Sequence, residues 1–219
     1  MSTLIERFSS KRNYLRIFLL LIVLLIITPV YSEEYHIVSQ SNSLTPEEVI
    51  KADIKAQNNN DLSTYLSLRT TKVGPPENRN EIMILREKYP EYDILQNTVK
   101  AQVVGIKSIP LSLVESITKI DEYFNIYSEI EAYYVAIDYQ LESENQYVYN
   151  GVNYRLYLLA LEEDQWVIIQ ISHIPVHRMI EEGYGFGTEE EKVALKIQKK
   201  QECTGEFINP KGEIIKIEK

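Results

Sequence analysis

Apolar side chains recur at helical spacing soon after the N-terminal segment. Residues 46–57 carry such a stripe, and Thr45 precedes it as an N-cap while Glu48 lies three residues further on, which is typical of a capping box. Asp61 can cap a second, shorter helix, and a third is expected over residues 77–89, before the chain reaches a proline. The pattern therefore predicts a set of helices at the start of the domain.

Beyond residue 90 the apolar period changes from helical to two. Strands are expected over residues 99–103, 131–142, 154–161 and 166–174. A hairpin is expected at Asn150-Gly151, the dipeptide most typical of tight β-turns. Residues 111–127 fit either a helix or a strand with a loop, and both alternatives remain open. Helices followed by an antiparallel meander predict an α+β fold.

The N-terminal segment has the three-part layout of a secretory signal. Basic residues precede an unbroken apolar run over residues 17–27, and small residues follow it. Cleavage is expected after Ser32, so residues 1–32 would be a signal peptide. The alternative is an uncleaved membrane anchor over residues 14–31, although a spanning helix needs about 20 apolar residues. Because the basic flank comes first, both alternatives place the rest of the chain outside the cytoplasm, secreted or in the cell envelope.

Length, charge and cysteine content narrow the functional classes. The chain has 219 residues, enough for one domain with flanking segments, and a formal net charge of −9. Its first 32 residues are basic, so the acidic excess lies beyond them, which argues against nucleic acid as a partner. Cys203 is the single cysteine, which excludes an intrachain disulfide and a cysteine-based metal site.

These signals divide the chain into four parts. After the signal segment, residues 33–43 are polar and are expected to form a flexible leader, and residues 44–176 form the predicted α+β domain. Residues 177–219 carry a second capping signal, Thr188 and Glu191, ahead of a further helix. This tail is too short for a core of its own. We expect it to pack on the outside of the domain or on a partner, as a connector rather than a site.

Two segments carry a resemblance to a known family. The turn at residues 60–62 between the first two predicted helices, and the closing hairpin over residues 158–168 with Trp166 in its last strand, are similar to the nuclear transport factor two-like superfamily. The resemblance covers about residues 44–176. It implies a curved antiparallel sheet wrapped around the N-terminal helices, a cone whose pocket some members use for small ligands, some for catalysis and many for neither. Homodimers formed through the sheet face are also common in that superfamily.

The resemblance directs attention to acidic residues on the sheet. Enzymes of the superfamily, such as isomerases and cyclases, use a carboxylate in the cone, and Asp138 lies on a predicted strand with Tyr134 on the same face. There the carboxylate could act as a base and the phenol could donate to an oxyanion. The competing interpretation is that Tyr134, Asp138 and Glu142 form the solvated face of an antiparallel sheet.

Other chemistry-bearing patterns are expected to be structural. His173 and His177 have a spacing that a helix would use for a metal, but Pro175 between them favours loop histidines. The glycine-spaced loop at residues 183–187 does not have the spacing of a dinucleotide fingerprint. Cys203 lacks a basic neighbour in sequence that would activate its thiol. We therefore expect no metal and no cofactor.

Tyrosine is over-represented, with 16 tyrosines against 5 phenylalanines. Tyrosine suits half-wet binding surfaces because its ring packs while its hydroxyl stays hydrated. Together with the export signal, this favours an exported bacterial binding module of the cell envelope, without catalysis, whose partner is a protein, a cell-wall polymer or a small apolar ligand. The alternative is a small-molecule enzyme of the isomerase or cyclase type that uses a carboxylate in the cone pocket.

Overall fold

The computed structural model describes residues 43–72, 78–89 and 93–215, which combine helices with one antiparallel sheet. The fold class is therefore α+β, as the sequence predicts. The signal segment expected over residues 1–32, and the leader as far as residue 42, lie outside the described residues. Within the described ranges, none of the helices has both the length and the apolar character needed to cross a bilayer.

The helices and strands follow one another in a simple order. Before the sheet, the described helices are α2 (Pro46–Asn58), α3 (Leu62–Ser67), α4 (Arg79–Lys88) and α5 (Ile94–Asn97). The strands are β1 (Thr98–Ile109), β2 (Ile130–Leu141), β3 (Gly151–Glu162) and β4 (Gln165–His173), and each pairs antiparallel with the next. Between β1 and β2 lie α6 (Leu111–Glu115) and α7 (Asp121–Phe124), and after β4 come α8 (Val176–Glu181) and α9 (Glu189–Thr204).

Side-chain caps determine where the first helices begin. Thr45 and Glu48 form the predicted capping box: the Glu48 carboxylate accepts from the Thr45 backbone N–H at 2.8 Å, and Thr45 Oγ1 accepts from the Glu48 N–H at 3.4 Å. Asp61 caps α3 by accepting from a backbone N–H of its first turn at 3.0 Å. Helix α4 begins after the N-cap Asn78, slightly later than the predicted start at residue 77.

The two hairpins on either side of β3 use different connections. Between β3 and β4 the chain reverses through Glu163 and Asp164, whose φ angles of 52° and 62° match the twist of the strands. Between β2 and β3 the prediction of a tight turn at Asn150-Gly151 is wrong, because residues 142–150 form a longer loop. The side-chain oxygen of Asn150 instead accepts from the backbone N–H of the last residue of β2 at 2.7 Å.

Two segments depart from simple periodicity. Register shifts in β1 mark bulges, and they leave Val99 and Val104 about half exposed, so the alternation predicted from residue 99 is wrong at that position. Residues 111–127, which the sequence leaves open, form the short helices α6 and α7. There Tyr123 is buried and Phe124 is exposed, because the helix that the spacing favoured is interrupted.

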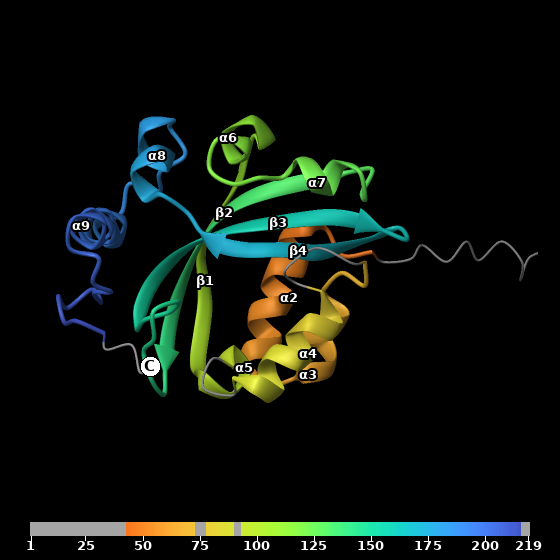
Figure 1. Cartoon of the computed structure of the whole chain (residues 1–219), viewed down its shortest axis with the longest axis horizontal. Coiled ribbons are helices and arrows are strands. Elements are labelled where there is room, and N and C mark those ends of the chain that lie inside the picture. Colours follow the sequence, from red (N-terminus) through yellow and green to blue (C-terminus); the bar gives the residue numbers. More distant parts are fainter. Residues whose placement is uncertain (1–42, 73–77, 90–92, 216–219) are drawn as a thin grey trace, which may run out of the picture. The chain divides into compact units, whose positions relative to one another are not determined.

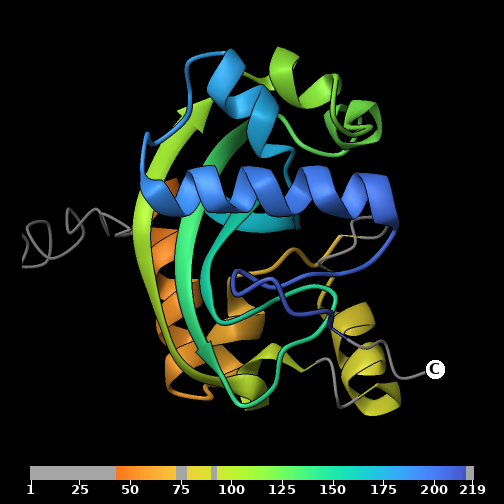
Figure 2. The same cartoon turned by 90° about the vertical axis from the view of Figure 1, so that its left-hand side faces the viewer.

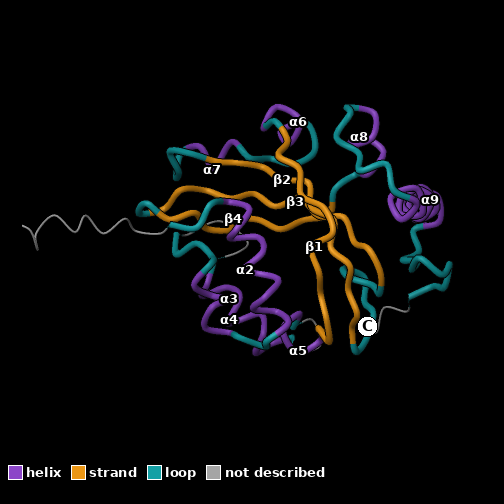
Figure 3. Tube along the Cα trace, turned by 180° about the vertical axis from the view of Figure 1, so that it is seen from behind, coloured by secondary structure: helices purple, strands orange, loops and turns teal. Residues whose placement is uncertain are grey.

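Helices cover both faces of the sheet, so consecutive residues in β2 and β3 are buried. The strands bend around α2, with α3 and α4 beside it, as Figure 1 shows and Figure 3 shows from behind. The side chains that pack on this face include Val49, Ile50, Val135, Ile137 and Leu159. On the opposite face α6–α9 cover a second cluster, and Figure 2 shows α9 lying across the strands. That cluster includes Tyr134, Leu156, Leu158 and Ile169.

The C-terminal tail packs on this second face. Ala194 and Ile197 of α9 are buried, and the ring of Phe186 stacks on Tyr134 with centroids 4.9 Å apart. A Cβ atom at Gly105 would lie 2.5 Å from the Phe186 ring, so a glycine in β1 is what allows this close approach. The tail thus lies on the outside of the α+β domain, one of the two placements that we expected.

Glu191 fastens the tail to the sheet. Its carboxylate is 1% exposed and accepts from the Tyr134 hydroxyl at 2.9 Å and from the Gly187 backbone N–H at 2.7 Å. Burial and this carboxylate raise the pKa of Tyr134, which therefore stays protonated and donates. Because Glu191 occupies the N-terminal end of α9, the loop at residues 183–187 serves as a structural turn rather than as an anion cradle.

A buried ion pair ties the N-terminal helices to the sheet. Asp53 of α2 and Arg69, which follows α3, are both fully buried, with Arg69 Nη1 2.7 Å from Asp53 Oδ1. Asp53 Oδ2 also accepts from the Tyr157 hydroxyl at 3.1 Å and from Gln57 Nε2 at 3.0 Å. The backbone of Arg69 forms a parallel bridge with Ile168 of β4. We call Asp53, Gln57, Arg69 and Tyr157 the Asp53 cluster.

Breaking the ion pair should destabilise the fold strongly. Arg69→Met or Asp53→Leu alone leaves one buried charge without its partner, and each should lower the free energy of unfolding in urea by about 3–5 kcal/mol. The double variant should lose much less than the sum, because no buried charge remains. Lys51→Met is the control: it removes an exposed pair with Glu47, and its effect should stay below about 1 kcal/mol. Single variants as stable as the wild type would contradict this role.

Shortening Ile197 to alanine tests whether the tail is docked in solution. Ile197 is 8% exposed, so Ile197→Ala should lower the free energy of unfolding by about 2–4 kcal/mol, whereas Val193→Ala on the exposed side of α9 should cost less than about 1 kcal/mol. Deletion of residues 189–219 should lower the thermal midpoint by several degrees. An unchanged midpoint, together with rapid proteolysis of the tail, would indicate that it is undocked.

Candidate functional site

A cavity of about 420 Å³ lies between the bend of the sheet and the N-terminal helices, and we call it the inner cavity. Residues of α2–α5, β2–β4 and the loop at residues 142–150 contribute to its walls. Its polar lining includes Gln57, Tyr139, Arg155, Tyr157, Ser172 and His173. The remaining lining is mainly apolar, for example Leu85, Val148 and Ile171. This size and this mixture are typical of small-molecule sites.

Hydrogen bonds to the Asp53 cluster orient the tyrosines of the inner cavity. Tyr139 donates to Gln57 Oε1 at 3.2 Å, Gln57 donates to Asp53, and Tyr157 donates to Asp53 directly. Burial is the main cause that raises the pKa of both phenols, so they remain neutral. Because the hydroxyl hydrogens are already directed at Gln57 and Asp53, the phenols present oxygen lone pairs rather than donors to any further group.

Arg155 supplies the positive charge in the wall of the inner cavity. It lies on β3 opposite His173 of β4 and is 9% exposed. Its Nη1 lies 3.0 and 3.1 Å from the two ring nitrogens of His173, and its Nη2 donates to the carbonyl oxygen of Tyr147. Within the described ranges no carboxylate forms an ion pair with Arg155, and burial lowers the pKa of its guanidinium.

His173 is held neutral by its surroundings. Desolvation and then the charge of Arg155 lower the pKa of His173 to about 4. Since an arginine only donates, the ring nitrogen that faces Nη1 must accept, which only an uncharged imidazole can do. His173 is exposed and lines the cavity, so it forms part of the rim. At neutral pH the pair Arg155 and His173 therefore carries one positive charge.

An apolar groove of about 430 Å³ adjoins the inner cavity, and we call it the α4 groove. The two hollows share Tyr65, Leu85, Ile94 and Tyr147. The exposed apolar side chains of Leu85 in α4 and of Tyr89, its C-cap, line this groove rather than a core. At its edge Arg86 pairs with Asp93 at 2.5 Å.

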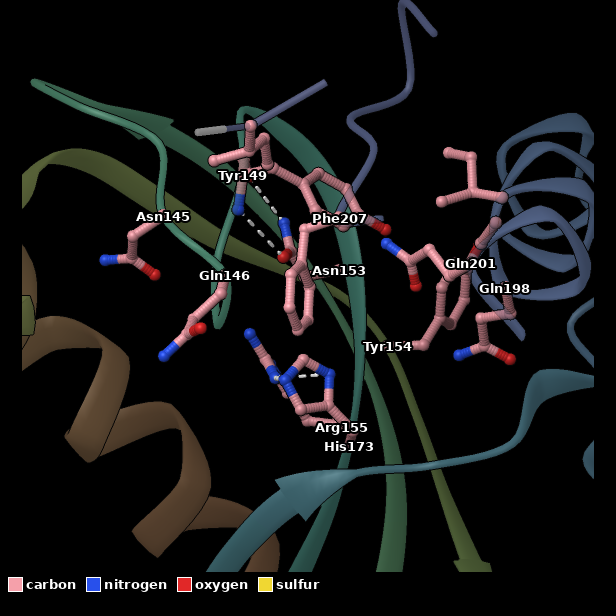
Figure 4. A pocket seen from close by; sticks show the side chains of 13 residues that line it. Asn145, Gln146, Tyr149, Asn153, Tyr154, Arg155, His173, Gln198, Gln201 and Phe207 are labelled. Atoms are coloured by element: carbon pink, nitrogen blue, oxygen red, sulfur yellow. Dashed lines mark hydrogen bonds between the residues drawn. The ribbon is translucent and has the colours of Figure 1, made fainter. Parts of the chain in front are cut away.

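A smaller cavity, of about 150 Å³, lies on the other side of Arg155, and we call it the tail cavity. Figure 4 shows its lining, in which side-chain amides from the loop at residues 142–150, from β3 and from α9 surround the arginine and histidine. The amides are those of Asn145, Gln146, Asn153, Gln198 and Gln201. The tail cavity shares Asn145, Arg155 and His173 with the inner cavity. The tail thus contributes to a cavity wall, which a connector would not need to do.

The structure does not bring Asp138 and Tyr134 together in the inner cavity. Both lie on the face of β2 opposite Tyr139, because β2 pairs with β3 over this stretch without a register shift. Asp138 is exposed, as the solvated-face interpretation expects, whereas Tyr134 is fully buried and donates to Glu191. The suggestion that Asp138 lines a pocket is therefore wrong, and the suggestion that Tyr134 is solvated is wrong too, because the tail covers that end of the strand.

The remaining sequence candidates stay apart from one another. His173 ends β4 while His177 lies in α8, and Cys203 near the end of α9 is exposed. In the part of the chain that the structure describes, no three side chains of histidine, cysteine, aspartate or glutamate lie close enough together to hold a metal ion.

Arg155 and the Asp53 cluster are the site residues that sequence reasoning missed. A signal for both exists in the pattern. Asp53 lies beside the apolar stripe of a predicted helix, and Arg155 lies between Tyr154 and Leu156 in a predicted strand whose neighbouring positions are apolar. Charged residues are almost never fully buried unless they are paired or functional. Each was therefore a candidate on residue type and position alone.

Comparison of the chain with protein-family models, with curated proteins and with solved structures finds no match.

Proposed function

We propose that this chain is an exported binding module that takes a small ligand in the inner cavity and performs no catalysis. The observation that carries the proposal is the cavity itself: about 420 Å³, walled by apolar and aromatic side chains, with a few polar groups held in place by hydrogen bonds. A preformed hollow of this kind is the default location of a ligand site.

The proposal includes membership of the nuclear transport factor two-like superfamily. Its support is the resemblance in sequence, the order of helices before a meander, and a sheet that bends around α2. In members of that superfamily that bind ligands, the pocket lies between the sheet and the helices, which is the location of the inner cavity here. Export rests on the pattern of residues 1–32.

Binding is favoured over the enzyme alternative by the chemistry of the cavity wall. Among the described lining residues of the inner cavity there is no aspartate or glutamate, so the carboxylate that an isomerase or cyclase would use is not supplied there. Asp53, the acidic residue of the Asp53 cluster, already accepts three hydrogen bonds from side chains and is the charge partner of Arg69. A general base needs a free lone pair directed at the substrate.

Filling the cavity should weaken ligand binding. In a screen of small aromatic compounds of differing charge against the full chain, we expect compounds that raise the thermal midpoint and shift the NMR signals of Tyr139 and Tyr157. Leu85→Trp places a large ring at the border of the inner cavity and the α4 groove, and should weaken binding at least about tenfold. Ile84→Trp, one residue away and 62% exposed, is the matched control and should bind normally. A screen without a compound that binds at the cavity would count against the proposal.

Mass spectrometry of the chain made in a secreting bacterium tests export. A mature chain that begins at Glu33 is expected, because the small residue Ser32 follows the apolar run. Retention of residues 1–32 in the membrane fraction, with the domain open to added protease on intact cells, would indicate the anchored alternative. Full protection of the domain from protease would contradict export in either form.

A further inference from the structure

We propose that the ligand of the inner cavity is a small organic anion, a carboxylate or a phosphate ester with an apolar body about the size of an aromatic ring, and that Arg155 binds its charged group. The proposal rests on the binding function proposed above and names the chemical class of the ligand. It follows from one juxtaposition: a buried guanidinium without a counter-charge stands in the wall of a cavity that adjoins an apolar groove.

Charge pairing sets Arg155 apart from Arg69, which is fully buried, and from Arg86, which is partly buried. Arg69 lies 2.7 Å from Asp53, and Arg86 lies 2.5 Å from Asp93. Arg155 is 9% exposed, yet it makes no ion pair with any carboxylate in the ranges that the structure describes. Removing a cation from water without a counter-charge is costly. An anion that enters the cavity would provide the missing charge, so the cost is offset when ligand is bound.

The guanidinium also has donors to spare. Of its five N–H groups, one is directed at His173 and one at the carbonyl of Tyr147. The other three N–H groups donate to no acceptor among the described residues. A carboxylate or phosphate needs two such donors for a bidentate contact, the strongest geometry that arginine offers. His173 and the Tyr147 carbonyl fix the orientation of the guanidinium while leaving that capacity open.

The surroundings select an organic anion rather than a bare ion. The phenols of Tyr139 and Tyr157 direct their hydrogens at the Asp53 cluster. They therefore offer no hydrogen-bond donors that could replace the water shell of a bare inorganic ion. The α4 groove shares Leu85 and Ile94 with the inner cavity and offers an apolar wall for a ring or a short alkyl chain. Since the chain carries a net charge of −9, non-specific attraction of anions to its surface is not expected.

A matched pair of probes separates charge from shape. Benzoate and benzamide have the same ring and nearly the same size, and differ in charge. By calorimetry with the full chain, benzoate or phenyl phosphate should bind at least about tenfold more tightly than benzamide, because only an anion gains the charged hydrogen bonds. Whichever of the two anions binds more tightly identifies the charged group, and inorganic phosphate, which lacks the apolar body, should bind more weakly than both.

Variants assign the effect to Arg155. Arg155→Met should lose at least about tenfold in affinity for the preferred anion, and Arg155→Lys should retain part of it, because lysine keeps the charge but not the bidentate fork. Arg178→Met removes the same charge from α8, where Arg178 contacts the Ser116 carbonyl, and should bind as the wild type does. The thermal midpoint of unliganded Arg155→Met should not fall, because the variant removes an unpaired buried charge; a structural role alone would lower it.

Different outcomes would overturn the anion proposal and the binding function on which it rests. Equal affinity for benzoate and benzamide, with shifted NMR signals of Tyr139 and Tyr157, would overturn the anion proposal and leave the cavity as a binding site. Unchanged affinity of Arg155→Met for benzoate would also overturn it. If Arg155→Met does not fold, the comparison of benzoate with benzamide on the wild-type chain still decides. Failure of neutral and charged compounds alike in the wider screen would overturn the binding function itself.

Discussion

The buried ion pair between Asp53 and Arg69 is the constraint on which the rest of the structure depends. A fully buried carboxylate is tolerable only when its charge and its lone pairs are satisfied. Here Gln57 of the same helix, Arg69 after α3 and Tyr157 of β3 do this. The requirement fixes the position of α2 against β3, and the backbone bridge from Arg69 to β4 fixes the segment after α3. The hydrogen bonds that satisfy Asp53 also orient Tyr139 and Tyr157 in the wall of the inner cavity.

The same structure contains a second buried arginine, Arg155, which has no carboxylate partner in the described ranges. Arg69 has its carboxylate, whereas Arg155 faces a neutral histidine, a carbonyl oxygen and a hollow. Both side chains are buried, with Arg69 0% and Arg155 9% exposed, so the difference does not arise from depth of burial alone. An unpaired cation in a cavity wall lowers the stability of the folded state. It can pair with an anion that enters the cavity, which is an example of the usual trade between stability and function.

Coverage of both sheet faces explains why cavities form where they do. On the second face the tail fills the space over Tyr134 with Phe186 and Glu191, and little room remains apart from the small tail cavity. On the first face the strands bend around α2, and the helices do not fill the bend completely. The loop at residues 142–150, longer than a tight turn, contributes Asn145 and Tyr147 to the rim. The geometry of the site therefore comes from a bent sheet, short helices and one long loop.

The sequence by itself determined the fold class, the helix starts and the strands of the meander, because capping residues and apolar periods act over a few neighbouring positions. The capping box of Thr45 with Glu48 and the cap at Asp61 are of this kind. Only the tertiary structure decided that Val99 is exposed by a bulge, that Tyr134 is covered by the tail, and that Asp138 remains in water. It alone placed Arg155 in a cavity wall without a counter-charge, while giving Arg69 its partner. Whether a charge is paired depends on residues far apart in the chain, such as Asp53 and Arg69, and no local pattern encodes that distance.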